Sequence, residues 1–152
     1  MISQKARYAF KALFALARQT DGVVQSREIA QSEQIPQSFL EQILLDLKRA
    51  GIVASRRGRE GGFYLLKDPT QLDCGQVLRL IDGPIAPLPC LSKTAYRRCD
   101  DCRDERSCAV RQVFADGYSA LVGTLEGMTI AEAVARSEGA RADGTVSEGA
   151  YI

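Results

Sequence analysis

Four cysteines lie close together in the second half of this sequence. Cys90, Cys99, Cys102 and Cys108 follow the spacing C-x8-C-x2-C-x5-C, within nineteen residues of the chain. Thiolates are ligands for soft or borderline metals, chiefly Zn²⁺ and the iron of iron–sulfur clusters. The pattern therefore predicts a loop whose thiols bind a metal or a cluster, or react as redox groups.

The cysteines alone leave several interpretations open. A structural zinc site usually has two CxxC pairs, or one CxxC with two histidines. This chain has a single CxxC, made by Cys99 and Cys102, and no histidine, although four thiols suffice for a zinc site with only cysteine ligands. A thiol switch without metal is a third interpretation, and chemically inert cysteines are a fourth. Cys74 lies outside the cluster, and we expect it to be buried as a packing residue.

A second group of residues with chemical potential is a basic, glycine-rich turn. Arg56, Arg57 and Arg59 lie between two short β runs, residues 52–55 and 63–66. Guanidinium groups pair with phosphates, and arginine is attracted into a narrow minor groove. An exposed turn that is merely solvated is the alternative. The surrounding charge favours nucleic acid as a partner, because this turn belongs to the basic half of the chain.

The charge is divided unevenly along the chain. Residues 1–67 hold eleven Lys or Arg and six Asp or Glu, a net charge of +5, whereas residues 68–152 hold nine and thirteen, a net charge of −4. A basic half followed by an acidic half favours a polyanion-binding module joined to a control or assembly module.

The apolar spacing predicts the elements that position both groups. Helices are expected over residues 3–18, from Ser26, and from Pro36 to Gly51, and the basic hairpin follows them. Three helices and a hairpin are typical of a winged helix-turn-helix. Further helices are expected over residues 70–82 and 109–125, with a short last helix from Thr129 to Ala135.

The sequence thus predicts a mainly α protein with a small β-hairpin and a long C-terminal helix. Four segments are expected: a winged helix-turn-helix DNA-binding domain (1–83), a cysteine cluster loop (84–108), a long helix with a short terminal helix (109–135), and a disordered tail (136–152). The apolar stripe of the long helix consists of Val110, Val113, Phe114, Gly117, Leu121 and Leu125.

Several classes of protein are excluded by composition. The absence of histidine removes His-based catalytic triads, Cys–His dyads and HExxH metalloproteases, so an enzyme is not expected. No apolar stretch is long enough to span a membrane. The apolar N-terminus is interrupted by Lys11 and has helical spacing, so it indicates a folded helix rather than a signal peptide. We therefore expect a cytoplasmic protein, in which clustered cysteines favour metal or redox chemistry over structural disulfides.

Over about residues 3–135 the sequence resembles the bacterial iron–sulfur-cluster winged-helix regulators, the Rrf family with its IscR and NsrR types. The resemblance is carried by several short segments: Tyr8-Ala9-Phe10, residues 38–44, Arg57-Gly58, Gly61-Gly62-Phe63, Asp82-Gly83-Pro84, and the stretch from Cys90 to Cys108. It implies a homodimer joined through the long helix, which binds an inverted repeat in double-stranded DNA with an affinity set by the state of its cluster.

The resemblance also assigns roles to single residues. Ser38, Glu41 and Gln42 match positions that read bases in the major groove, and Arg57 matches an arginine placed in the minor groove. This agrees with general chemistry, since Gln pairs with adenine and Glu accepts from cytosine. Helix N-terminal residues face the DNA, so the full expected DNA-binding set is Ser26, Pro36, Gln37, Ser38, Glu41, Gln42, Arg56, Arg57 and Arg59.

The cysteine ligands match the family less closely. Cys90 and Cys108 match the outer ligands, and either Cys99 or Cys102 matches the middle one. Arg111 and Arg7 stand where some members have a further ligand, a histidine or a carboxylate, and arginine cannot ligate iron. Either all four cysteines bind, or one carboxylate completes the set, the candidates being Asp100, Asp101, Asp104 and Glu105. The cluster type, [2Fe-2S] or [4Fe-4S], stays open, with zinc as the lesser alternative.

The predicted function is a DNA-binding transcriptional regulator that responds to iron, redox or nitrosative signals through an iron–sulfur cluster. The alternative is a winged-helix protein-interaction module with a structural zinc or thiol-switch site. The arginine-rich turn favours the regulator, because a module that binds only protein has no need of three adjacent arginines there.

Overall fold

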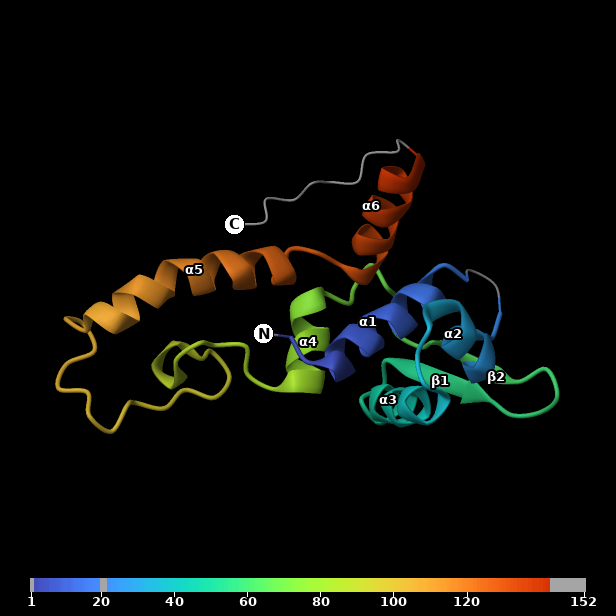
Figure 1. Ribbon diagram of the computed structural model, residues 1–152, viewed down its shortest axis with the longest axis horizontal. Helices are drawn as coiled ribbons and strands as arrows, with labels where there is room; N and C mark the ends of the chain where they lie inside the picture. The colour runs from blue at the N-terminus through green and yellow to red at the C-terminus, as the bar shows by residue number, and fades with distance from the viewer. Residues whose placement is uncertain (1, 20–21, 143–152) are drawn as a thin grey trace.

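The computed structural model describes residues 2–19 and 22–142, which form six α-helices, one 3₁₀ turn and a two-stranded antiparallel sheet (Figure 1). In chain order the elements are α1 (Gln4–Ala17), α2 (Ser26–Glu33), α3 (Gln37–Arg49), β1 (Val53–Arg56), β2 (Gly62–Leu65), α4 (Cys74–Asp82), η1 (Pro89–Leu91), α5 (Ala109–Glu126) and α6 (Ile130–Ala142). The predicted class, mainly α with a winged helix-turn-helix, is confirmed.

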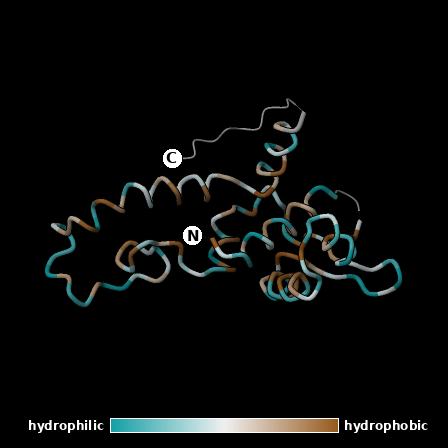
Figure 2. The backbone as a smooth tube through the Cα atoms, viewed as in Figure 1, coloured by the Kyte–Doolittle hydropathy of each residue, from teal (hydrophilic) through white to brown (hydrophobic). Residues whose placement is uncertain are grey.

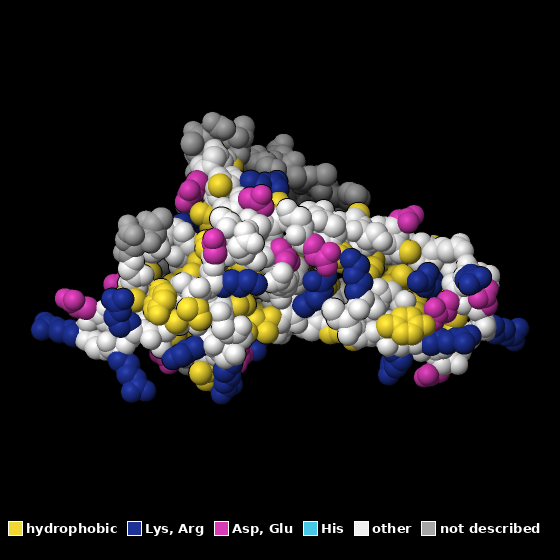
Figure 3. Space-filling view, turned by 180° about the vertical axis from the view of Figure 1, so that it is seen from behind, with side chains coloured by type: hydrophobic (Ala, Val, Ile, Leu, Met, Phe, Trp, Pro, Cys, Tyr) yellow, Lys and Arg dark blue, Asp and Glu magenta, His cyan; other side chains and the backbone are white. Residues whose placement is uncertain are grey.

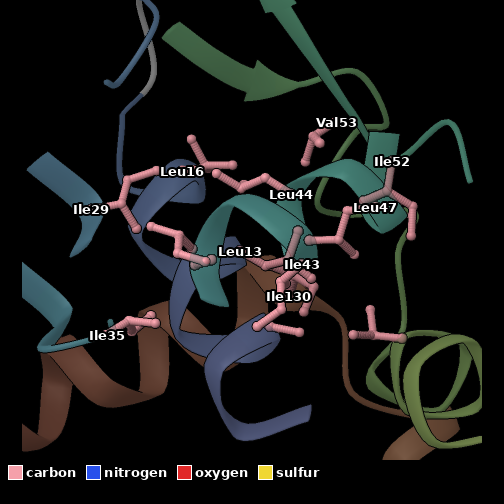
Figure 4. Close-up of a cluster of buried hydrophobic side chains, with 14 of the residues drawn as sticks. Leu13, Leu16, Ile29, Ile35, Ile43, Leu44, Leu47, Ile52, Val53 and Ile130 are labelled. Carbon is pink, nitrogen blue, oxygen red and sulfur yellow. The ribbon is translucent and has the colours of Figure 1, made fainter. Parts of the chain in front are cut away.

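Helix α1 is the central element of the winged-helix body. Ser3 caps it, because its hydroxyl accepts from the Ala6 backbone N–H at 3.0 Å. Its buried face combines alanines with two leucines, and it contacts α2, α3, α4, α6 and β2. Small side chains on this face let the surrounding helices approach closely. Figure 4 shows Leu13 and Leu16 among the side chains of the other elements.

Helices α2 and α3 form the helix-turn-helix. The turn between them contains Gln34, whose φ of 54° is left-handed, and Pro36, which precedes the first turn of α3. Four apolar residues of α3 recur at helical spacing and are fully buried: Leu40, Ile43, Leu44 and Leu47. Gly51 follows the helix with a φ of +70°, as its position after the apolar run predicted.

The wing is a short hairpin that is tied to the start of α2. β1 and β2 pair in antiparallel register from Val53 opposite Leu65 to Arg56 opposite Gly62. Val24 and Phe63 exchange two backbone hydrogen bonds of 2.9 and 2.8 Å. A Cβ at Gly62 would lie 2.4 Å from the Val24 carbonyl oxygen, so this close approach requires glycine.

Helix α4 is shorter at its start than the sequence predicted. Residues 70–73 are not helical, because Asp68 accepts from the Thr70 N–H and hydroxyl at 2.8 and 2.7 Å, and Asp73 caps α4 by accepting from the Gln76 N–H at 2.7 Å. Cys74, the first residue of α4, is buried in the core, as expected.

Helix α5 extends away from the winged-helix body, and the cysteine loop lies at its far end (Figure 1). Tyr118 and Val122 are its buried residues, and they were absent from the predicted stripe. Of that stripe, Val110, Val113, Phe114 and Leu121 are exposed, whereas Leu125 packs against the core. Figure 2 shows hydrophobic residues recurring along this helix.

Helix α6 corrects the predicted organisation of the C-terminal part. It continues to Ala142, whereas a disordered tail was expected from residue 136; the expected tail beyond residue 142 lies outside the described residues. It belongs to the winged-helix body rather than to a unit with α5, because Ile130 is fully buried in the main core (Figure 4). Arg18 of α1 pairs with Glu138 at 3.7 Å, a long-range contact that supports the extra turns. The predicted Thr129 cap is present, since its hydroxyl accepts from the Glu132 N–H at 3.2 Å.

Across residues 2–19 and 22–142, no helix is both long and apolar enough to cross a membrane.

Candidate nucleic-acid interface and cysteine loop

The polar residues predicted on the third helix lie together on one exposed surface. Pro36, Gln37, Ser38, Glu41 and Gln42 are all exposed, while the opposite side of α3 is buried in the core. Their backbone is therefore held by apolar packing, and their side chains are free to meet a ligand. The surface lies at the N-terminal half of α3, the part of a recognition helix that contacts base edges.

Hydrogen bonds orient the side chains of this surface before any ligand is present. The Gln37 amide nitrogen donates to the Ser26 hydroxyl at 3.0 Å and to the Glu41 carboxylate at 2.8 Å. Gln37 thus links the start of α2 to α3, and Ser26 is brought into the same surface as the residues of α3.

A further acidic residue of α3 escaped the sequence analysis. The Asp46 carboxylate accepts from the Gln42 amide nitrogen at 3.2 Å and pairs with Lys5 of α1 at 2.8 Å. The hydrogen bond from Lys5 is the main factor that lowers the pKa of Asp46 from its ordinary value. Helical spacing could have revealed the Gln42 contact, because the two residues are four apart. The Lys5 contact spans the fold and leaves no local sequence signal.

The three arginines of the wing are exposed at its turn. Arg56, Arg57 and Arg59 make no ion pair with the described residues, and together with Gln25 and Ser26 they line a shallow hollow between the wing and the start of α2. In Figure 3, Lys and Arg side chains project from the end of the molecule that carries the wing. Unpaired guanidinium groups beside a hydroxyl and helix N–H groups form a surface suited to phosphate.

The cysteine loop brings its four thiols near one another in sequence order, with Cys99 influenced by Cys90 and Cys102, and Cys102 by Cys108. The pKa of the Cys99 thiol is raised, first by desolvation and then by the charge of Cys90 and a hydrogen bond with it. Desolvation and the charge of Cys108 likewise raise the pKa of Cys102. Cys90 is buried, and the other three are half-buried. Within the described residues no three donor side chains are arranged around a single point.

Polar contacts hold the backbone of this loop. The Arg98 guanidinium donates to the carbonyl oxygens of Cys102 and Arg103, both at 2.8 Å. The Asp104 carboxylate accepts from the Arg106 and Ser107 N–H groups at 3.1 and 3.2 Å.

The four candidate carboxylate ligands differ in their present contacts. Asp104 is engaged as a turn cap, and Glu105 accepts from the Tyr96 hydroxyl at 2.6 Å. Asp100 and Asp101 have no hydrogen bond to the described side chains, and both lie between Cys99 and Cys102 in the sequence. Of the carboxylates, these two are therefore the better placed to complete a ligand set.

The donor set fits an iron–sulfur cluster in kind. Four thiols in one loop supply the sulfur ligands that such clusters take, and a bound cation would remove the mutual repulsion that disfavours the thiolates. The four thiols would have to move closer together to hold it. Arg111, which the sequence resemblance matches to a histidine ligand, has a buried Nε with no hydrogen-bond partner among the described residues and supplies no lone pair.

One carboxylate ties the cysteine loop and α5 to the winged-helix body. Glu126, the last residue of α5, accepts a hydrogen bond from Arg79 of α4 and pairs with Lys93 of the cysteine loop at 3.4 Å. The Arg79 hydrogen bond is the main cause of the lowered pKa of Glu126. Three residues after Arg79, Asp82 at the C-terminal end of α4 accepts from the Ser3 backbone N–H at 2.9 Å and from the Ser3 hydroxyl. Helix α4 therefore contacts both Glu126, which also pairs with the cysteine loop, and Ser3, which caps α1.

Comparison with known proteins agrees with this geometry. A family model described as Rrf2, an iron-dependent transcriptional regulator, matches residues 2–136. An rrf2-like HTH-type transcriptional regulator of Rhodobacter capsulatus is 48% identical over 139 residues, covering 89% of this chain and 93% of that protein. The regulator IscR of Photobacterium profundum is 31% identical over 132 residues, covering 86% of this chain and 73% of its own.

Among solved structures, CymR, the global cysteine regulator of Bacillus subtilis, superimposes with a TM-score of 0.75 and 27% identity, covering 90% of this chain and 97% of that one. The fold and the exposed helix-turn-helix are those of winged-helix transcriptional regulators. The chain belongs to the Rrf2 family. It is a transcriptional regulator and not an enzyme, as the absence of histidine led us to expect.

The wing yields a first prediction. Replacing Arg57 by alanine should weaken binding to all DNA duplexes by a similar factor and reduce the slope of log K against log salt concentration by about one, because one charge near the phosphates is lost. Fluorescence anisotropy titrations at several salt concentrations measure this slope. Arg136→Ala, on the exposed surface of α6, removes the same charge away from the wing and should leave the slope unchanged. An unchanged slope for Arg57→Ala would remove this residue from the interface.

Proposed function

We propose that this protein is a cytoplasmic, homodimeric transcriptional regulator whose affinity for an inverted-repeat operator depends on an iron–sulfur cluster bound by its cysteine loop. The observation that carries the proposal is the presence of an exposed, pre-oriented recognition surface and a four-thiol loop on one chain, connected through α4. The Rrf2 family membership supports the DNA-binding part, and the likeness to IscR supports the cluster.

In this proposal, α3 enters the major groove of double-stranded DNA. Ser38, Glu41 and Gln42 contact base edges there, and Ser26, Pro36 and Gln37 lie against the adjoining backbone. The wing follows the neighbouring minor groove with Arg56, Arg57 and Arg59. The support is the exposure of all these residues but the half-buried Ser26, and the absence of ion pairs between the wing arginines and the described residues, which leaves their charge available for phosphate.

The proposed cluster ligands are Cys90, Cys99, Cys102 and Cys108. Each middle cysteine already neighbours an outer one, and Cys99 also neighbours Cys102, so a four-thiol set needs only that the thiols draw closer together. Either [2Fe-2S] or [4Fe-4S] accepts such a set. Bound there, a cluster would supply a charge and stability that change with iron, redox or nitrosative conditions.

The chain's own contacts provide a route from the loop to the DNA-binding surface. Lys93 lies three residues after Cys90 and pairs with Glu126, which also binds Arg79 of α4. Asp82 of α4 holds the cap residue of α1, Ser3, and α1 packs against α3. Ordering the cysteine loop would thus restrain α4 and, through α1, the recognition helix. A coupling of this kind typically amounts to about 1–3 kcal/mol.

The proposed dimer interface is the exposed apolar face of α5. Val110, Val113, Phe114 and Leu121 are each about half exposed or more, and a Cβ at Gly117 would meet nothing within 4 Å. A second copy of the helix packed on this face would bury these side chains, with Gly117 permitting a close crossing. Two recognition helices related by the resulting twofold axis would match two half-sites of an inverted repeat.

A metal-free thiol switch is the second candidate, and one observation favours it. Cys90 is among the groups that raise the pKa of the Cys99 thiol, so the two thiols are neighbours that an oxidant could join as a disulfide. The likeness to the cysteine regulator CymR is consistent with a sensor that needs no iron. A zinc site made of the same four thiols is the remaining possibility, and metal analysis separates all three.

The ligand proposal predicts the outcome of a cysteine series. Cys90→Ala and Cys108→Ala should abolish the cluster, because each removes an outer ligand. Cys99→Ala and Cys102→Ala should each lose it too if all four thiols bind, whereas Cys74→Ala should keep it. Protein reconstituted with iron and sulfide under anaerobic conditions is assayed by visible absorbance and by iron, sulfide and zinc content. Full retention of the cluster without Cys108, or zinc in place of iron in protein purified anaerobically, would contradict the assignment.

The dimer proposal predicts that Val113→Asp yields monomers, because it places a charge in the centre of the apolar face of α5. Analytical ultracentrifugation over a range of concentrations measures the effect. Leu66→Asp, at an exposed leucine of the winged-helix body, is the matched control and should remain dimeric. If Val113→Asp and the unmodified protein formed assemblies of the same mass in solution, the dimer interface would not be the apolar face of α5.

A further inference from the structure

A carboxylate on the DNA-facing helix makes contacts that the proposed function does not yet use. One oxygen of Asp46 accepts from the Gln42 amide nitrogen at 3.2 Å, and the other pairs with Lys5 at 2.8 Å. Arg49 lies 3.6 Å from the first oxygen. Asp46 is only partly exposed, with a quarter of its side chain accessible, so these contacts form on a restricted surface beside the recognition residues.

The hydrogen bond to Asp46 determines which way the Gln42 amide faces. A glutamine amide has a donor end and an acceptor end, and an unrestrained one can rotate to present either. An ionised carboxylate only accepts hydrogen bonds, so it selects the NH2 end of Gln42 for itself. The carbonyl oxygen and the second N–H of Gln42 are left for an outside partner.

This arrangement matches one base in particular. In the major groove adenine presents an acceptor, N7, beside a donor, the N6 amino group. The free N–H of Gln42 can donate to N7 while its carbonyl oxygen accepts from N6. If the amide were free to rotate, its interaction with bases that present other patterns would compete with this pairing.

Lys5 makes it feasible to have an acidic residue so close to DNA. An unpaired carboxylate near phosphates would repel them, and it could also take up a proton and become a donor. The Lys5 ammonium group and the Arg49 guanidinium offset the charge of Asp46. Because Lys5 comes from α1, the orientation of a residue on the recognition helix depends on how that helix packs against α1.

We propose that Asp46, held by Lys5, is a positioning residue that sets base specificity: it fixes the Gln42 amide so that α3 selects adenine at one base pair of each half-site. The inference rests on the proposed function, in which α3 lies in the major groove. Neither Asp46 nor Lys5 touches a base, since both act through Gln42.

The test compares four variants with the unmodified protein on an operator selected from random duplexes, in which every base pair is then varied singly. Gln42→Ala identifies the base pair that Gln42 reads. Asp46→Asn keeps the shape but can accept or donate, so it should lower discrimination at that same base pair by roughly three- to tenfold, out of the roughly 5- to 150-fold that a good bidentate contact provides. At the other base pairs, the variant should discriminate between bases as the unmodified protein does.

One charge control and a second positioning variant separate positioning from electrostatics. Glu60→Gln removes one negative charge from the wing without touching Gln42, and it should leave discrimination at the Gln42 base pair unchanged. Lys5→Met removes the group that holds Asp46, so it should weaken binding to all duplexes and also lower discrimination at the Gln42 base pair. Circular dichroism of each variant verifies that the helices are formed.

The outcomes distinguish this inference from the proposed function. If the unmodified protein selects no operator, the proposed function is wrong. If Gln42→Ala relaxes one base pair but Asp46→Asn does not, or if Asp46→Asn changes all sequences equally, only the role of Asp46 is wrong. Loss of the same preference in Glu60→Gln would likewise reduce the effect to charge and overturn the positioning role.

Discussion

The packing of α1 is the constraint on which the rest of this structure depends. One helix, lined on its buried side by small and branched apolar residues, contacts the recognition helix, α4 and α6. Because protein interiors are closely packed, a displacement of any one of these helices strains the packing of the others against α1. The body that presents α3 to DNA is therefore also the body on which α4, and with it the cysteine loop, is anchored. One core therefore carries both the helix-turn-helix and the helix that anchors the cysteine loop.

The polar contacts around this core have a common character, because most of them join elements that lie far apart in the sequence. Ser3 with Asp82, Lys5 with Asp46, and Arg79 with Glu126 each fasten a helix end or face to another helix. The two partly exposed ion pairs among them, Lys5 with Asp46 and Arg79 with Glu126, contribute little to the free energy of unfolding. Their value lies in orientation: they determine how α4 meets α1 and how the recognition surface is held. This is consistent with a regulator whose parts must move by small, defined amounts.

Local patterns in the sequence predicted much of the fold. The spacing of Leu40, Ile43, Leu44 and Leu47 and the glycine that follows them predicted α3, and the glycines of the basic turn predicted the wing. The extension of α6 was missed because Ile130 and the Arg18 pair with Glu138 stabilise it from across the fold, whereas the local composition is typical of a tail. The candidate site divides in the same way. The exposure of Ser38, Glu41 and Gln42 follows from helical periodicity, whereas the pairing of Cys90 with Cys99 depends on the path of an irregular loop and could not be predicted.

Coupling between the cysteine loop and the recognition surface is the central claim. The most direct measurement is the affinity of one protein preparation for its selected operator, at one fixed salt concentration, before and after anaerobic removal of the cluster, with a non-operator duplex measured in parallel. Coupling predicts operator affinities that differ by about 5- to 150-fold, with a much smaller change on the non-operator duplex. Equal operator affinities of the cluster-loaded and cluster-free protein would contradict it.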